Sequence, residues 1–314
     1  MRTTTSEFIL AIHDASMYLS PADFHRWSLS EIRSYIDFDF AIWGGGNGDS
    51  RQLHMATVLD QVDTFFETWE TVKHHDPYAD LVIGNTGRTW SIEEVPGFRH
   101  SEAYSEHWGR YSARQMVSTM EVDPYTGLHI FVTLARENPD ALFTRDEVSA
   151  KNLITQHLFL ASRHNDMHYL RARQAPAAFV DQRGLLHASL PEFCALMVSE
   201  WGRQAGYRLP EPVTQALWNT GHCQSRHLSL NAERYNHRLL VRAAETPSVT
   251  LSPRETEIAW MYAQGNSYKR VAQRVGVSPT TVRTHLARVY QKLGVSDKGS
   301  LAIWLKENQG NPEP

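Results

Sequence analysis

The sequence predicts a multidomain protein in which an N-terminal α+β region is followed by an all-α domain. The chain has 314 residues, which is enough for two or three domains at roughly 100–200 residues each. Helical periodicity and strand-like alternation are interleaved up to about residue 245, as expected for an α+β fold. After residue 246 only helical periodicity remains, and each helical segment has its own start and stop signals.

The first segment, residues 1–173, is expected to combine helices with a sheet. Apolar residues alternate on both sides of Gly44–Gly48, which predicts a β-hairpin whose turn lies at these glycines. A long amphipathic helix closes the segment, with Thr144 as its N-cap and Glu147 completing a capping box. Further helices are expected at residues 8–18, 20–36 and 60–73, and further strands at 115–122 and 128–134.

The second segment, residues 174–245, predicts a smaller sheet with one helix. We expect a hairpin that turns at Gly184, a helix over residues 190–201, and a second hairpin that turns near Asn231. This order of elements resembles a shortened PAS domain, which is a signal-sensing fold. By itself the segment is small for an independent hydrophobic core.

The third segment, residues 246–311, contains helices with complete start and stop signals. Ser252 is the expected N-cap of the first helix, Glu255 completes its capping box, and Gly265 ends it. The next two helices are expected to begin after Ser267 and Ser278, and the turn between them contains a glycine. Two helices joined in this way fit a helix-turn-helix. The third helix has one apolar stripe, formed by Val282, Leu286, Val289 and Leu293.

The face opposite this stripe has the composition expected of a DNA-reading helix. Arginine pairs with guanine edges or phosphates, and threonine contacts thymine methyl groups or phosphates. Residues 250–307 contain nine Lys or Arg against four Asp or Glu, although the whole chain has a net charge of −4. The alternatives are a solvated helix face or a module that only associates with other proteins. The residues expected to contact DNA are Ser278, Thr280, Thr281, Arg283, Thr284, His285 and Arg288.

These residues resemble the LuxR-type, or GerE-type, helix-turn-helix family. The resemblance is carried by LSPRETEIAWMYAQGNSYKRVAQRVGVSPTTVRTHLARVYQKLGVSDK, and the domain it implies, residues 246–311, is about a fifth of the chain. It implies a transcriptional regulator with a recognition helix over Ser278–Leu293, with double-stranded DNA as its partner and RNA polymerase as a further candidate partner. Tyr268-Lys269 and Asp297-Lys298 depart from the common pattern and leave the DNA sequence open. The resemblance also implies a homodimer formed by the last helix through Leu301, Ala302, Trp304 and Leu305.

The N-terminal region resembles a GAF-like domain or the autoinducer-binding domain that usually accompanies this module. Asp76-Pro77, Trp90 and Gly127 stand at comparable places, whereas the remaining pocket residues of that family do not align. The resemblance implies that Asp76 accepts a hydrogen bond from a small-molecule signal and that Trp90 donates one or stacks on the ligand. Control by a protein partner or by expression level is the alternative. An apolar pocket is expected to be lined by Trp43, Trp69, Tyr104, Trp108 and Tyr111.

The sequence gives no sign of an enzyme, a cofactor or a metal centre. Nucleophile-elbow, zinc-protease and phosphate-loop motifs are absent, so we expect a regulator without a cofactor. His74-His75-Asp76 is expected to be a solvated turn, because adjacent histidines rarely bind one ion together. The two cysteines, Cys194 and Cys223, are too few for a zinc site and suit a reducing compartment.

The chain is expected to work in the cytoplasm and away from membranes. No apolar run approaches the roughly 18–20 residues that a membrane span requires. The first ten residues, MRTTTSEFIL, lack an apolar core of the length found in an export signal.

Overall fold

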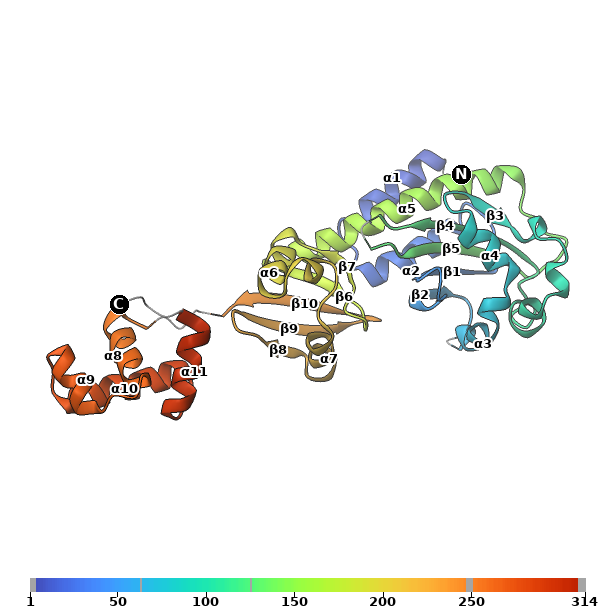
Figure 1. Cartoon of the computed structure of the whole chain (residues 1–314). Helices are drawn as coiled ribbons and strands as arrows, with labels where there is room; N and C mark the ends of the chain where they lie inside the picture. Colours follow the sequence, from blue (N-terminus) through green and yellow to red (C-terminus); the bar gives the residue numbers. More distant parts are fainter. Residues whose placement is uncertain (1–3, 63, 125, 247–250, 310–314) are drawn as a thin grey trace. The chain divides into compact units, whose positions relative to one another are not determined.

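The computed structural model describes residues 4–62, 64–124, 126–246 and 251–309 (Figure 1). The chain divides into two compact units, Met1–Glu245 and Thr246–Pro314, which we treat separately. The expected end of the last domain at residue 311 lies outside the described residues. The prediction of an α+β region followed by an all-α domain is confirmed.

The first unit begins with an antiparallel sheet that has helices on both faces (Figure 1). Its strand order is β2-β1-β5-β4-β3. Adjacent residues of a strand point to opposite faces. Ala41 and Trp43 of β1 therefore pack with α1, α2 and α5, whereas Phe40 and Ile42 pack with α3 and α4. The strands are β1 Phe40–Gly46, β2 Leu53–Leu59, β3 Thr89–Ser91, β4 Gln115–Val122 and β5 His129–Arg136, and the helices are α1 Thr5–Ala15, α2 Pro21–Ile32, α3 Phe65–Val72, α4 Pro77–Gly84 and α5 Arg145–Arg171.

The glycine-rich hairpin differs from its prediction. Gly44, Gly45 and Gly46 belong to β1 itself, and the turn follows them. Gly44 has a packing reason for lacking a side chain, since a Cβ there would lie 2.3 Å from the ring of Phe131 on the neighbouring strand. Gly44 thus leaves room for the ring of Phe131 beside the strand.

A second antiparallel sheet with two helices completes the first unit (Figure 1). Its strand order is β7-β6-β10-β9-β8. If β6 is counted as its first strand, this is the order 2-1-5-4-3, the same as in the first sheet. Phe193, Met197 and Leu217 of its helices pack on Leu230 and Val241 of its strands, so the segment has its own core. The elements are β6 Ala177–Val180, β7 Leu186–Ser189, α6 Pro191–Trp201, α7 Glu211–Thr220, β8 His222–Gln224, β9 Leu228–Tyr235 and β10 Arg238–Glu245.

The second hairpin of this sheet turns five residues later than predicted. Asn231 lies inside β9, where it pairs with Arg242. The turn lies at Asn236, which has a φ of +53°. Asparagine tolerates this left-handed conformation, and the sequence offers an asparagine at both positions. The helix α7 was not predicted at all.

The second unit is a compact group of helices around one apolar core (Figure 1). Ile258, Val271, Val282 and Leu286 meet at its centre. The predicted N-caps are confirmed, since the hydroxyls of Ser252, Ser267 and Ser278 each accept a backbone N–H three residues on. The helices are α8 Pro253–Ala263, α9 Tyr268–Val275, α10 Pro279–Leu293 and α11 Lys298–Gln309.

Across the described part of the chain, every helix is too short or too polar to cross a membrane.

Candidate nucleic-acid interface and apolar cavity

Residues at both ends of α10, the third helix of the second unit, stabilise this helix. The hydroxyl of Ser278 accepts the N–H of Thr281 at 3.1 Å and lies 2.8 Å from the hydroxyl of Thr281. Gly276 and Gly294 flank the helix with φ values of +71° and +65°, which suit glycine best. Ser278 and Thr281 therefore have a structural role at the N-terminus, where backbone N–H groups also favour a phosphate.

The outer face of α10 presents most of the predicted DNA contacts to solvent. Val282, Leu286 and Val289 are buried, as the apolar stripe predicts. Arg283 and Arg288 are exposed on the other side. The guanidinium of Arg283 lies 5.2 Å from the ring centre of Tyr268 on α9, which is a cation–π distance. Of the other predicted contacts, Ser278, Thr280 and Thr284 are exposed, and Thr281 and His285 are half-buried.

The exposed arginines of α10 are not neutralised by an ion pair with any described residue. Within the described part of this unit, neither Arg283 nor Arg288 forms an ion pair, whereas Arg254 pairs with Glu257 and Lys292 pairs with Glu255. An unpaired arginine on a convex helix is available to bind phosphates or guanine edges. The arrangement of α9 and α10, joined by the turn at Gly276, is that of a helix-turn-helix DNA-binding domain.

The buried carboxylate of Glu255 ties α8 to α10. It accepts a hydrogen bond from Nζ of Lys292 at 2.7 Å and one from the N–H of Ser252 at 2.8 Å. These two interactions, with Lys292 the stronger, lower the pKa of Glu255 to about 2. Because its pKa is lower in the folded than in the unfolded state, Glu255 stabilises the domain above its unfolded pKa, and this contribution is lost as the pH falls from about 4.5 towards 2.

We expect Glu255→Gln to destabilise this domain at neutral pH by about 1 kcal/mol, because it removes a charge-assisted hydrogen bond. We expect peptides from α8 and α10 to be less protected from hydrogen exchange in the variant than in the wild type at neutral pH. The difference in protection should be smaller near about pH 3. Glu257→Gln is the matched control, since Glu257 is exposed on the same helix. An equal effect of both variants at both pH values would contradict this role.

The last helix, α11, corrects the predicted dimer surface. Leu301 and Leu305 are fully buried in the core of their own domain, and Trp304 packs against that core. Side chains that fill the core of a protomer cannot also form its dimer interface. Ala302 is half-buried, and the large apolar residue that α11 leaves exposed is Ile303, at 60%.

An apolar cavity lies in the first unit, between the sheet and the helices α3 and α4. The space inside it that the centre of a water molecule can reach is about 70 Å³, and its mouth opens to solvent. Aromatic and aliphatic side chains dominate the wall, and the hydroxyls of Ser118 and Thr133 form a hydrogen-bonded pair there, 2.9 Å apart. The strands contribute Leu53, Met120, His129 and Phe131, and the helices contribute Phe66, Trp69, Tyr78 and Val82.

His129 is the polar residue of this wall that lacks a partner. Its Nδ1 atom is buried and has no hydrogen-bond partner among the described residues. Burial lowers the pKa of the imidazole, opposed by the negative charge of Asp49. At neutral pH the imidazole of His129 is therefore uncharged, and its Nδ1 atom is available for a hydrogen bond with a ligand.

Asp76 lies behind the cavity wall. Its carboxylate accepts N–H groups from Trp108 at 2.8 Å and Trp69 at 3.3 Å, and from the backbone of Tyr78 and Ala79 at 3.0 and 3.1 Å. Burial raises the pKa of Asp76, and these four hydrogen bonds oppose that rise. The carboxylate is the N-cap of α4, and it orients two indoles of the cavity.

The other predicted ligand contacts have structural partners instead. Trp43 points to the opposite face of the sheet, since it differs by one residue from the cavity-side position of Ile42. The indole N–H of Trp90 donates to the carbonyl of Asn85 at 2.7 Å. The hydroxyl of Tyr104 accepts from Arg114 at 2.8 Å. Of the five aromatic residues expected to line the pocket, Trp69 and Trp108 line this cavity.

Comparison with known proteins supports the class of the second unit. Residues 249–305 match the family described as bacterial regulatory proteins, luxR family. A stretch of 59 residues is 46% identical to the probable transcriptional regulatory protein NarL of Mycobacterium tuberculosis, covering 19% of this chain and 27% of that protein. A stretch of 64 residues is 38% identical to the transcriptional regulatory protein UhpA of Escherichia coli, covering 20% and 33%.

The C-terminal domain is therefore a LuxR-type helix-turn-helix domain, as its sequence predicts. The chain spans about a third or less of the length of these curated relatives. A crystal structure of Escherichia coli SdiA aligns with 99% of this chain and 100% of its own, at 11% identity and a TM-score of 0.40. That similarity is too low to support a conclusion about the first unit.

Proposed function

We propose that this protein is a sequence-specific DNA-binding transcriptional regulator and not an enzyme. The observation that carries the proposal is that Arg283 and Arg288 are exposed on the outer face of α10 and form no ion pair among the described residues, within a domain that matches the luxR family. Recognition helices of this kind read base edges in the major groove, and their N-termini contact phosphates. Ser278, Thr280, Thr281, Thr284 and His285 complete the proposed DNA surface.

We infer that the regulator binds DNA as a homodimer in the cytoplasm. Operators of helix-turn-helix proteins mirror the two-fold symmetry of a protein dimer. With Leu301 and Leu305 in the domain core, Ala302, Ile303 and Trp304 are the apolar residues of α11 that keep exposed surface for a dimer contact. RNA polymerase is a candidate partner of the bound dimer. The proposed domain borders are 1–173, 174–245 and 246–311.

We further propose that a small molecule bound in the cavity of the first sheet controls the regulator. The aromatic wall of the cavity suits an apolar ligand. The unpartnered Nδ1 of His129 and the hydroxyl pair of Ser118 and Thr133 supply polar groups that would orient one polar end.

Extraction of the purified protein with organic solvent, followed by mass spectrometry, tests this control. We expect a stoichiometric small molecule from the wild type and its loss from Ala79→Phe, because Ala79 lines the cavity and a phenyl ring there fills it. Ala244→Phe is the control, since Ala244 is exposed on β10 in the second sheet. Equal recovery from both variants would exclude the cavity as the site. An empty wild type would favour control by a protein partner or by expression level.

A further inference from the structure

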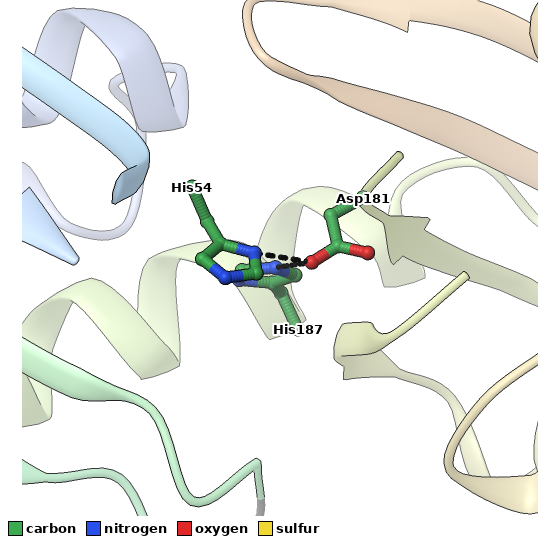
Figure 2. Close-up of side chains that lie close together, drawn as sticks. All are labelled: His54, Asp181 and His187. Atoms are coloured by element: carbon green, nitrogen blue, oxygen red, sulfur yellow. Dashed lines mark hydrogen bonds and ion pairs between the residues drawn. The ribbon is translucent and has the colours of Figure 1, made fainter. Parts of the chain in front are cut away.

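Two histidines and one aspartate from distant parts of the sequence meet in the first unit, between its two sheets. His54 lies on β2 of the first sheet, Asp181 directly follows β6, and His187 lies on β7. Nδ1 of His54 is 2.7 Å and Nε2 of His187 is 3.2 Å from the same carboxylate oxygen of Asp181 (Figure 2). The three side chains are only 6%, 3% and 7% exposed.

The three side chains are of the types that bind a tetrahedral metal ion, and their 2.7 and 3.2 Å separations in the structure are hydrogen-bond distances, shorter than the spacing of ligand atoms around a bound ion. Zinc binds imidazole nitrogen and carboxylate oxygen at about 2.0–2.2 Å, so neighbouring ligand atoms of a tetrahedron lie roughly 3.3–3.5 Å apart. The ligand atoms of His54, Asp181 and His187 all lie within 4.8 Å of one another. Two imidazoles and one carboxylate form three corners of such a site, and the fourth corner is left for water or a further ligand.

The surroundings of Asp181 hold its carboxylate in place for this role. Its second oxygen accepts the N–H groups of Arg183 and Leu185, each at 2.9 Å, which directs the first oxygen towards the two histidines. Such support of a ligating carboxylate by backbone hydrogen bonds is usual around metal ions.

The two imidazoles face the same oxygen of Asp181, so an ion placed among the three side chains would contact all of them. Nε2 of His54 lies outside this set of ligand atoms, and it is buried with no partner among the described residues.

We propose that His54, Asp181 and His187 bind a divalent transition-metal ion, for which Zn²⁺ is the best match. The ion joins the first sheet to the second, because one ligand comes from the first and two from the second. The expectation of no metal site rested on His74-His75 and on the two cysteines, whereas His54 and Asp181 lie 127 residues apart and form no local motif.

Titration of chelator-treated, untagged full-length protein with Zn²⁺ against a chromophoric chelator tests the proposal. We expect one tight site per chain. Removing a first ligand should weaken binding by more than the ~10–100-fold that follows loss of a supporting residue. His54→Gln and His187→Gln are the test variants, because glutamine keeps a polar side chain of similar size. His74→Ala and His75→Ala, two exposed histidines on the same unit, should leave the affinity unchanged.

A second measurement keeps the proposal testable if the variants fold poorly, which circular dichroism would reveal. Wild-type protein loaded with Co²⁺ should show the intense visible absorption of a four-coordinate ion, and Zn²⁺ should displace it. Zinc should also raise the thermal midpoint of the wild type, because a ligand that binds only the folded state stabilises it. A weak spectrum like that of hydrated Co²⁺, or equal Zn²⁺ affinity in wild type and both glutamine variants, would overturn the proposal.

Discussion

Replacing both Arg283 and Arg288 by alanine should abolish specific DNA binding under conditions in which the wild type binds tightly. Each bidentate contact to a base contributes about 1–3 kcal/mol of discrimination, so losing two weakens binding by about two orders of magnitude or more. If either arginine contacts phosphate instead, the slope of log affinity against log salt should fall by ~0.9 per lost contact. Titration of labelled duplex at several salt concentrations separates these two roles.

Arg203→Ala is the matched control for this experiment. Arg203 is exposed on the first unit, so the variant loses one positive charge far along the sequence from α10. It should bind DNA as the wild type does, apart from a small effect of net charge. If the double variant at 283 and 288 retained wild-type affinity and salt dependence, the outer face of α10 would not be the DNA surface.

Asp76→Ala should strongly destabilise the first unit. The carboxylate is fully buried and accepts four N–H groups, two of them from the indoles of Trp69 and Trp108. Leaving buried donors unpaired costs ~1–3 kcal/mol each, and loss of the N-cap of α4 adds about 1 kcal/mol, so we expect a total of at least about 3 kcal/mol. Denaturant unfolding of the full chain, followed by tryptophan fluorescence, measures the change.

Asp80→Ala separates this effect from a general effect of losing an acid on α4. Asp80 lies one turn further along the helix and is 59% exposed, and its ion pair with Arg51 is partly solvated. We expect this variant to lose less than about 1 kcal/mol. Equal stability of the two variants would contradict the anchoring role of Asp76 and restore it as a candidate ligand contact.

Local sequence patterns predicted the helices of the C-terminal domain and their buried face. The caps at Ser252, Ser267 and Ser278 and the stripe from Val282 to Val289 depend on residues within one or two turns of each other. The assignment of Leu301 and Leu305 to a dimer surface failed for a physical reason. Apolar spacing shows that a helix buries one face, but not whether it is buried by its own chain or by a partner.

The cavity depends on contacts that the sequence does not display. His129 and Phe131 reach its wall because β5 pairs with both β1 and β4, and this register is set by long-range pairing. One available signal was missed: alternation along β1 places Trp43 on the face opposite to Ile42, which excludes it from the cavity. The capping role of Asp76 was also predictable, since Asp-Pro frequently begins a helix.

The most direct test of DNA recognition is a selection of bound sequences from a pool of randomised duplexes, run in parallel with the wild type and the Arg283→Ala/Arg288→Ala variant. We predict that the wild type enriches one motif with two-fold symmetry and that the variant enriches none. Failure of the wild type to enrich any sequence, or enrichment of the same motif by both proteins, would contradict the assignment of α10 as the recognition helix.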